Sequence, residues 1–334
     1  NVADICPVGA LTTKDFRFKI RVWFLEEAPG ICTGCSNGCN VFLGVANNKV
    51  YRYVPRRNDA VNDTWICDAG RMTYKEIGAE DRLKRPAVRN AGGALEAVSF
   101  VRAVDEAAAR LRRLLQTKGP SVIAGVASGF AGNEDLAVFH RFLAALGTDL
   151  RGVALPTGAA DEILIKAEKA PNGEGARLLG FGDAKAVVNR IRGGGVEGLI
   201  VLGHDLLGSG YLGSAAELAK LDTVIVLDTH RSGLERVAHV VLPVRHAAEK
   251  DATYTNHAGR VQRSWPVIEP SFEAYAEGEV LARIAAALGL PGFDGKFDVL
   301  DVSRSLGELS PAFRGLDLES VGERGRPVTT TAGR

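Results

Sequence analysis

Residues 31–39 read ICTGCSNGC and place Cys32, Cys35 and Cys39 within one short loop. A fourth cysteine, Cys67, follows after residues 40–66. Glycines between the cysteines leave the loop free to bend around a bound group. Iron–sulfur clusters of the four-iron kind are held by four cysteine thiolates. The spacing therefore predicts a [4Fe–4S] site formed by these four cysteines.

Two alternatives to the cluster stay open at this point. Zinc also accepts four thiolates, although the three residues between Cys35 and Cys39 resemble a zinc site less than a second C-x2-C pair would. Unbound thiols are the other alternative. Backbone N–H groups at Gly34 and Gly38 could donate to cluster sulfurs and raise the reduction potential. Nearby cations could act in the same direction, although a solvated surface position is favoured for each: Lys49, Arg52, Arg56, Arg57 and Arg71.

The composition is that of a globular protein with more than one domain. The 334 residues suit about two or three domains, and 46% are hydrophobic and 24% charged. A formal net charge of +1 gives no general attraction to nucleic acid or to a membrane surface. No stretch has the apolar length of a membrane-spanning helix, and no secretory signal is visible. Five cysteines are too few for a disulfide scaffold, which favours a reducing, cytosol-facing compartment.

Changes in sequence texture predict four parts. Residues 1–19 hold Cys6 and a basic stretch, and residues 20–76 hold the four-cysteine set. In residues 77–321, short apolar runs alternate with amphipathic stretches, which favours an α/β region with a mainly parallel sheet. Residues 322–334 are polar and rich in Gly, Pro and Thr, and we expect them to be disordered.

Individual elements follow from the same patterns. Alternation of β-favouring residues predicts short strands at 22–25 and 48–54. Short apolar runs predict buried parallel strands at 121–127, 198–203, 223–227 and 239–243. Helical periodicity predicts helices at 104–115, 134–146, 214–220 and 274–288.

Cys6 stands apart from the other four cysteines. The pair Cys6-Pro7 is similar to the last ligand of a bacterial ferredoxin run, in which a proline follows the cysteine. Matching upstream cysteines are missing from the sequence, so either the partners of Cys6 lie outside it or Cys6 is an ordinary buried thiol. The chain also begins with Asn1 rather than Met, which predicts a fragment or a truncated sequence.

Other polar patterns indicate no catalytic chemistry. Residues 128–133 follow a predicted strand, but they match neither G-x-G-x-x-G nor the Walker A pattern, so a structural turn is favoured over a nucleotide site. The sequence contains neither G-x-S-x-G nor H-E-x-x-H. Five further side chains could in principle be catalytic but are not expected to be: His230, His239, His246, Asp222 and Asp228.

Seven stretches of the chain follow the pattern of one known family. They read CPVGALT at 6–12, FRFKIRVWFL at 16–25, VNDTWICDAGR at 61–71, KAPNGEGA at 169–176, GLIVLG at 198–203, VVLP at 240–243 and EKDATYTNHAGRVQ at 249–262. In combination they resemble the large iron–sulfur subunit of bacterial NADH–quinone oxidoreductase (complex I). The resemblance covers nearly all of residues 1–290.

This resemblance implies a fold and a set of ligands. The fold is similar to that of molybdopterin oxidoreductases, with a small β-rich cluster domain followed by α/β domains. The resemblance assigns a [4Fe–4S] cluster to the four-cysteine set and makes residues 1–19 the remnant of an upstream ferredoxin-like iron–sulfur domain. Cys6 would then be a ligand of a cluster in that upstream domain.

The resemblance also implies a role. Subunits of this kind pass electrons from NADH and flavin toward quinone, and the cluster that matches the four cysteines is thought to lie off the main electron path. The expected partners are other peripheral-arm subunits, namely the flavin- and NADH-binding subunit and further iron–sulfur subunits, and not nucleic acid. The expected location is the cytoplasmic face of the bacterial inner membrane, without direct membrane insertion. The chain is expected to act in an enzyme without holding a complete active site itself.

A competing branch of the same fold contains molybdenum- or tungsten-dependent oxidoreductases such as formate dehydrogenases. These enzymes usually have a lysine two residues after the fourth cluster cysteine, where this chain has Ala69. Many also supply a cysteine to the metal, and no cysteine follows Cys67. Molybdopterin is therefore not expected, while a truncated molybdoenzyme with a serine ligand remains the alternative.

Overall fold

Three β-sheets organise residues 1–329, the part of the chain that this computed structural model describes. The first sheet is antiparallel and contains β1 (Glu26–Ile31), β2 (Asn40–Ala46) and β3 (Lys49–Pro55). Asn47 and Asn48 join β2 to β3 with φ angles of 50° and 57°, as a two-residue hairpin turn requires. Two short helices follow the sheet: α1 (Asp68–Met72) and α2 (Tyr74–Ile77).

The second sheet has eight strands in the order β5-β4-β11-β10-β9-β6-β7-β8. Strands β6 to β11 pair in parallel, while β4 pairs antiparallel with β5 and β11. The chain adds β7 and β8 on one side of β6 and then returns to add β9, β10 and β11 on the other side. The bounds are β4 (Ala87–Arg89), β5 (Leu95–Ala97), β6 (Ile123–Ser128), β7 (Arg151–Ala154), β8 (Gly182–Asp183), β9 (Gly198–Leu202), β10 (Thr223–Asp228) and β11 (Val240–Pro243).

Successive side chains of a strand point to opposite faces of this sheet, and because both sets are apolar, helices cover both faces. On β10, Val224 and Val226 point into one hydrophobic core, and Ile225 and Leu227 point into the other. The larger core contains residues of α3 (Phe100–Thr117), α4 (Asn133–Leu146) and α7 (Glu277–Leu288), and the smaller core contains residues of α6 (Ala184–Arg192). The remaining helices are α5 (Gly173–Leu178), α8 (Val299–Arg304) and α9 (Leu306–Leu309).

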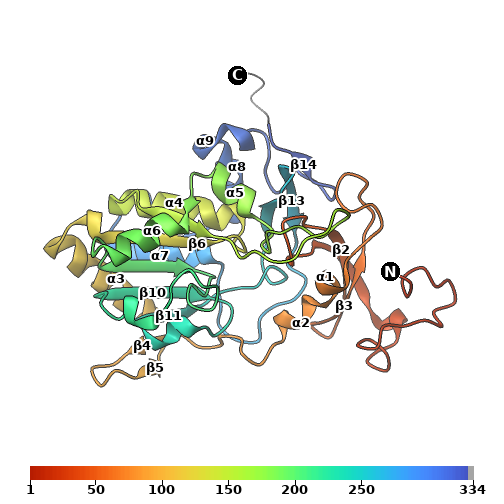
Figure 1. Ribbon diagram of the computed structural model, residues 1–334, viewed down its shortest axis with the longest axis horizontal. Helices are drawn as coiled ribbons and strands as arrows, with labels where there is room; N and C mark the ends of the chain where they lie inside the picture. Colours follow the sequence, from red (N-terminus) through yellow and green to blue (C-terminus); the bar gives the residue numbers. More distant parts are fainter. Residues whose placement is uncertain (330–334) are drawn as a thin grey trace.

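The third sheet is antiparallel and lies between the other two. It contains β12 (Ala252–Thr255), β13 (Arg260–Ser264) and β14 (Arg326–Pro327). Strand β13 packs against β1 of the first sheet, and β12 packs against α4 and α5. In Figure 1 the eight-stranded sheet and the first sheet accordingly lie on opposite sides of the molecule, with the N-terminal segment next to the first sheet.

The structure confirms the predicted fold class and most of the predicted elements. The apolar runs form β6, β9, β10 and β11, the expected helices form α3, α4 and α7, and the strand expected at 48–54 is β3. These segments carry strong periodic signals, and each reaches a partner surface that buries its apolar side.

Two predicted elements are wrong. Residues 22–25, expected as a strand, contain a 3₁₀ turn at Val22–Phe24 whose three side chains are exposed, because β1 and not this segment pairs with β2. The helix expected at 214–220 is a single 3₁₀ turn, Ala215–Glu217, closed by a Ser214–Glu217 capping box. So short a segment does not form a stable helix without tertiary packing.

The predicted disordered tail at 322–334 is only partly described. Residues 330–334 lie outside the described residues. Within residues 322–329 the expectation is wrong, because Arg326–Pro327 form β14 and pair with Arg260 and Val261. Among the described helices, none is both long enough and apolar enough to cross a membrane.

Candidate metal centre

The structure gathers the four predicted cysteines at one end of the first sheet. Cys32 directly follows β1, and Cys39 directly precedes β2, with the Cys32 N–H donating to the Cys39 carbonyl at 2.8 Å. Cys67 caps the N-terminus of α1. Cys32, Cys35 and Cys39 are buried, and Cys67 is partly buried. The hairpin β1–β2 and helix α1 thus bring residues from both sides of the 40–66 gap together.

Gly70 shows how closely the sulfurs approach the backbone. A Cβ atom added at Gly70 would stand 2.8 Å from the Cys32 sulfur and 3.2 Å from the Cys67 sulfur. Because real Cβ atoms do not approach other atoms so closely, only glycine fits between these two ligands.

Three polar groups donate to the sulfurs. The Gly34 N–H donates to the Cys32 sulfur at 3.4 Å, and the Gly70 N–H donates to the Cys67 sulfur at 3.2 Å. The Asn37 side-chain amide donates to the Cys39 sulfur at 3.1 Å. Such donors stabilise thiolates and raise the potential of a bound iron–sulfur cluster.

Burial governs the protonation of two of these thiols. It raises the pKa of the Cys32 thiol far above its ordinary value, and the neighbouring Cys39 raises that pKa further. Burial also raises the pKa of Cys39 to about 12, against the effect of the hydrogen bond from Asn37. Without a bound cation these thiols therefore stay protonated at neutral pH, and a metal centre would displace their protons.

The four cysteine thiols are neighbours, since Cys35, Cys39 and Cys67 all act electrostatically on Cys32. Among residues 1–329, no group of three or more His, Cys, Asp or Glu side chains is placed to hold a single metal ion. A mononuclear zinc site needs four sulfurs at about 2.3 Å from one ion. In a [4Fe–4S] centre the four cysteines instead bind a cluster of several atoms, which is larger than a single ion.

Segments from the third sheet hold the cysteine loop in place. The Gln262 amide donates to the Gly38 carbonyl at 3.0 Å, and the Asn256 amide donates to the Asn37 carbonyl at 3.1 Å. Gly38 has a φ of 60°, which favours glycine. In the sequence, the stretch 249–262 stands out only through the family resemblance, and no local pattern predicted these contacts.

The five predicted cations have different surroundings. Lys49 and Arg57 are exposed, and Arg52 is partly buried. Arg56 and Arg71 are buried, with 6% of each residue exposed. The prediction that each of these cations is a solvated surface residue is therefore confirmed for Lys49 and Arg57 and wrong for Arg56 and Arg71.

Cys6 lies outside the four-cysteine set, in the N-terminal segment, and is partly exposed. The backbone N–H groups of residues 8–11, that of Leu11 foremost, lower the pKa of the Cys6 thiol. This environment favours a thiolate, which is the form that binds metals.

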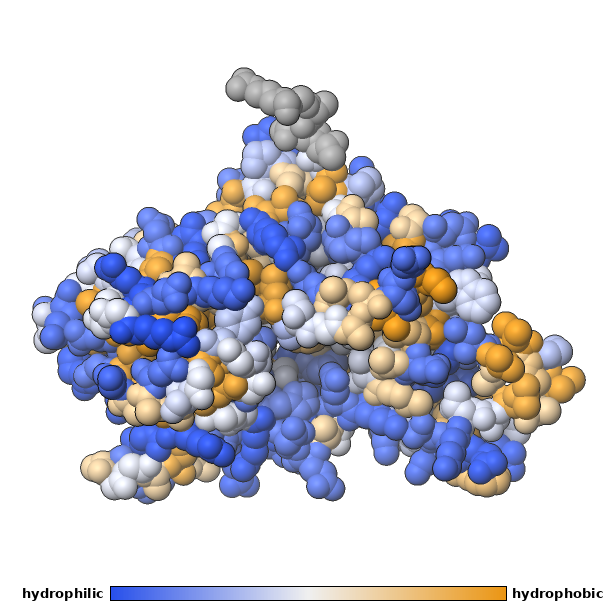
Figure 2. All heavy atoms as spheres, viewed as in Figure 1, coloured by the Kyte–Doolittle hydropathy of each residue, from blue (hydrophilic) through white to orange (hydrophobic). Residues whose placement is uncertain are grey.

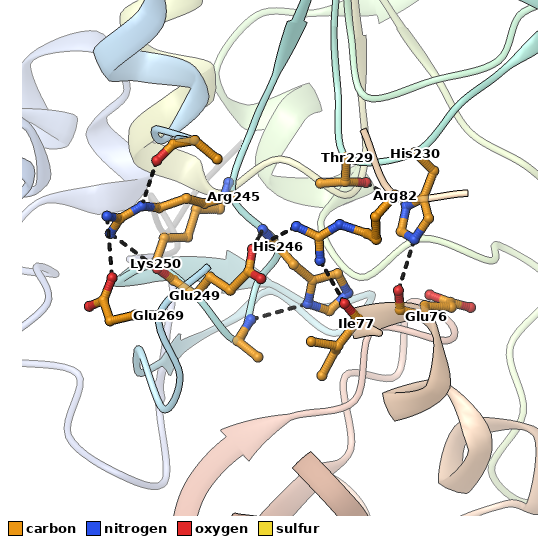
Figure 3. Close-up of polar contacts among 12 residues, drawn as sticks. Glu76, Ile77, Arg82, Thr229, His230, Arg245, His246, Glu249, Lys250 and Glu269 are labelled. Carbon is orange, nitrogen blue, oxygen red and sulfur yellow. Dashed lines mark hydrogen bonds and ion pairs between the residues drawn. The ribbon is translucent and has the colours of Figure 1, made fainter. Parts of the chain in front are cut away.

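A polar network joins the cluster module, residues 26–77, to the eight-stranded sheet (Figure 3). The Arg82 guanidinium donates to Glu249 at 2.8 Å, and both side chains are almost fully buried. Arg82 also donates to the Ile77 carbonyl at 3.0 Å, and His230 lies 2.9 Å from the Glu76 carbonyl. These side chains fix helix α2 against the sheet.

Two further histidines have structural surroundings. His246 is buried, its pKa is lowered to about 3 by burial and then by Arg82, and it accepts a hydrogen bond from the Ala248 N–H. His239 accepts a hydrogen bond from the Val224 N–H through Nδ1. These contacts account for both imidazoles as parts of the fold.

A cavity of about 280 Å³ lies beside this network, at the carboxyl ends of β6, β9 and β10. Its lining includes Thr33 from the cysteine loop and the buried Lys250. The Lys250 ammonium donates to Asp135 at 2.7 Å and to Glu277. Two carboxylates therefore already engage this buried cation.

Comparison with known proteins places these features in a family. The family model described as "Molybdopterin oxidoreductase" matches residues 82–188 and 150–287, which together cover more than half of the chain. The model described as "Molybdopterin oxidoreductase Fe4S4 domain" matches residues 25–78, the part that contains the four cysteines.

Curated relatives align with part of the chain. A NADH-quinone oxidoreductase subunit of Streptomyces coelicolor is 40% identical over 119 residues, which are 36% of this chain and 14% of that protein. NADH-quinone oxidoreductase subunit 3 of Thermus thermophilus is 42% identical over 97 residues, which are 29% of this chain and 12% of that protein. The chain thus spans only a small part of these relatives' length.

A solved structure with the same fold is acetylene hydratase from Pelobacter acetylenicus. The TM-score is 0.68, and the match covers 90% of this chain and 74% of that one. With 11% sequence identity, this likeness shows the fold alone.

Proposed function

Because the chain belongs to the molybdopterin oxidoreductase family, we propose that it is part of an iron–sulfur electron-transfer subunit of a complex I-type NADH:quinone oxidoreductase. The relatives named as subunits of NADH-quinone oxidoreductase support the choice of this complex. The observation that carries the proposal is the gathering of four buried or partly buried cysteines between the β1–β2 hairpin and α1. A four-iron cluster supplies one-electron chemistry when bound.

We assign Cys32, Cys35, Cys39 and Cys67 as the ligands of one [4Fe–4S] cluster. Gly34, Gly70 and Asn37 donate to three of the sulfurs. The match of residues 25–78 to the Fe4S4 domain model favours a cluster over a single zinc ion. In this role the chain supplies the thiolate ligands, donates hydrogen bonds to their sulfurs and excludes water from the cluster.

We further propose that this chain holds no molybdopterin. Two features of the chain support this proposal. Ala69 stands where the related enzymes have lysine. Lys250 in the cavity wall is already paired with two carboxylates. Both features favour a chain without this cofactor.

The proposed organisation follows from the cluster. Residues 20–76 form the cluster domain, and residues 77–321 form a scaffold for partner subunits. Residues 1–19 belong with an upstream iron–sulfur domain, where Cys6 is a ligand of another cluster. The N–H groups of residues 8–11 that lower the pKa of Cys6 support this assignment.

The N-terminal segment has the surface of a docking element. Twelve large hydrophobic side chains are exposed in the described residues, and eight of them lie in residues 1–24, including Phe18, Trp23 and Phe24. Figure 2 shows apolar atoms gathered at the side of the molecule where this segment lies. Exposed apolar clusters of this kind commonly mark protein contacts. We propose that other subunits of the peripheral arm cover it and that electrons from NADH and flavin pass toward quinone through this assembly, at the cytoplasmic face of the membrane.

Electron paramagnetic resonance (EPR) spectroscopy of the anaerobically purified chain tests the cluster assignment. We expect a signal that appears on reduction with dithionite and is absent in Cys67→Ser, while Cys6→Ser retains it. A wild-type chain without such a signal would contradict the electron-transfer proposal for this part of the protein.

A further inference from the structure

The buried Arg71 holds the N-terminal segment by its guanidinium. It donates to Asp4 Oδ1 at 3.0 Å and also contacts Asp4 Oδ2, so the pair is bidentate. The two side chains are 8% and 15% exposed. Bidentate guanidinium–carboxylate pairs are among the stronger and more directional hydrogen-bonded contacts in proteins.

A second contact holds the same segment on the other side of Cys67. The Asn1 amide donates to the Ile66 carbonyl at 2.9 Å, and the Ile66 N–H donates to the Asn1 side-chain oxygen at 3.2 Å. Ile66 is fully buried and directly precedes Cys67. Asn1 and Asp4 thus bracket the ligand between positions 66 and 71.

Two further hydrogen bonds join Arg71 to the cluster module. Its backbone N–H donates to the Cys67 carbonyl at 2.9 Å, and its guanidinium donates to the Tyr53 carbonyl at 3.2 Å. Tyr53 is buried in the same hydrophobic cluster as Cys32 and Cys39. A full positive charge is therefore held inside the cluster module, where charges are poorly screened.

We propose that Asp4 and Arg71 form a charge-neutral clamp, a positioning pair that fixes the segment carrying Cys6 to helix α1 and, by its balanced charge, keeps the reduction potential of the four-cysteine centre from being shifted by either ion alone. The proposal rests on the cluster assignment above. Because a reduced cluster carries one more negative charge than an oxidised one, an uncompensated cation nearby raises its potential and an uncompensated anion lowers it. The paired state keeps the clamp electrically neutral.

Opposite charge changes separate this role from a purely structural one. In Asp4→Asn the guanidinium loses its counter-charge. At a fixed potential we expect a ratio of oxidised to reduced cluster that is at least tenfold lower, which corresponds to an upward shift of the reduction potential by about 59 mV. In Arg71→Met the carboxylate is left alone, and we expect a downward shift. The double variant restores neutrality and returns toward the wild-type value. EPR-monitored redox titration measures all three.

A matched pair at the surface of the same module provides the control. Arg57 and Asp59 are paired at 2.8 Å but are 69% and 68% exposed. Asp59→Asn and Arg57→Met make the same charge changes in water, and we expect the potential to stay within a third of the shift in Asp4→Asn. Shifts of one sign in both Asp4→Asn and Arg71→Met, or no shift in either with iron retained, would overturn the proposal.

Hydrogen exchange tests the clamp without using the cluster. The N–H groups of Asp4 and Ile5 donate to the Asn1 carbonyl in the clamped segment. We expect their exchange to be at least tenfold faster in Arg71→Met, with partial protection in Arg71→Lys, which keeps the charge but not the planar fork. Unchanged exchange in Arg71→Met would overturn the clamp even in a chain that binds no iron. Absence of iron from the wild type would instead overturn the cluster assignment and the effect on potential.

Discussion

The cluster module and the eight-stranded sheet are held together by different kinds of contact. The sheet separates two large hydrophobic cores, and the larger one contains buried residues from α3, α4, α7 and the strands and loops around them. The module at residues 26–77 has a small core in which two of the members, Cys32 and Cys39, are cysteines. Much of its remaining structure is fixed by polar side chains such as Asn37 and Asn62.

This difference indicates that the two regions depend on metal to different degrees. Hydrophobic burial stabilises the sheet without any ligand. In the module, buried thiols occupy core positions, and in the proposed assignment their stabilising partner is the metal centre. The module should therefore be the region that loses structure when the metal centre is absent.

Removal of the cluster is the experiment with the largest expected effect. Under chelation we expect fast hydrogen exchange throughout residues 26–77, including the Cys32 N–H that donates to Cys39. Exchange in β9 and β10 should stay slow, because both strands are fully buried. Hydrogen exchange with mass spectrometry reads both regions in one sample. Equal protection of residues 26–77 with and without the cluster would contradict the view that the cluster module depends on metal more than the sheet does.

A single methyl group at Gly70 should produce the next largest effect. In Gly70→Ala the new Cβ would meet the Cys32 and Cys67 sulfurs, so we expect most of the iron to be lost. Gly78→Ala is the matched control, because nothing lies within 4 Å of its added Cβ. Iron analysis of both variants decides the outcome. Full iron content in Gly70→Ala would contradict the described arrangement of the ligands.

A mutation that creates a cavity in the larger core should affect the eight-stranded sheet and not the cluster module. Phe139 on α4 is fully buried, and its truncation to alanine should lower the free energy of unfolding by about 3–5 kcal/mol. The cluster EPR signal should remain, since Phe139 is not part of the module. Phe130→Ala serves as the control, because that ring is 37% exposed. A changed EPR signal in Phe139→Ala would show that the two regions are not independent.

The smallest expected effect concerns a buried carboxyl at the end of β10. Burial raises the pKa of Asp228 from 3.8 to about 7, so wild-type stability falls as pH rises through this range. Asp228→Asn keeps an oxygen that accepts from the Thr229 and His230 N–H groups. Because one pKa unit corresponds to about 1.4 kcal/mol and relaxation recovers part of it, we expect the variant to be about 1–2 kcal/mol more stable at pH 8.

The pH dependence provides the check on this prediction. Well below pH 3.8 the wild-type carboxyl is protonated in both the folded and the unfolded state, so the two proteins should have similar stability. Chemical denaturation at about pH 3 and at pH 8 measures the difference. A variant that is less stable than the wild type at pH 8 would contradict the buried position of Asp228.

Sequence patterns predicted what depends on local periodicity or on ligand spacing. The runs that became β9 and β10 are apolar on both faces, and the four cysteines follow a spacing that few other functions require. Contacts between residues that lie far apart in the sequence produced no pattern from which they could be predicted. Gln262 supports the cysteine loop from more than 200 residues away, and the acidic partners of Lys250 come from α4 and α7.

The exposed segment at residues 22–25 shows a further limit of sequence patterns. Val22, Trp23 and Phe24 have the composition of a strand, but no neighbouring strand offers them hydrogen bonds in the described part of the chain. Strand propensity reflects the packing surface that a residue meets, and here that surface is solvent. The same exposure supports the proposed contact with other subunits.

Iron, acid-labile sulfide, zinc and molybdenum analysis of the anaerobically purified chain determines which metal centre the four cysteines hold. We expect about four irons and four sulfides per chain, bound through Cys32, Cys35, Cys39 and Cys67, with no molybdenum. Zinc without sulfide would contradict the cluster and leave a structural metal site. Molybdenum together with iron would contradict the exclusion of molybdopterin and make the cavity at the strand ends a catalytic site.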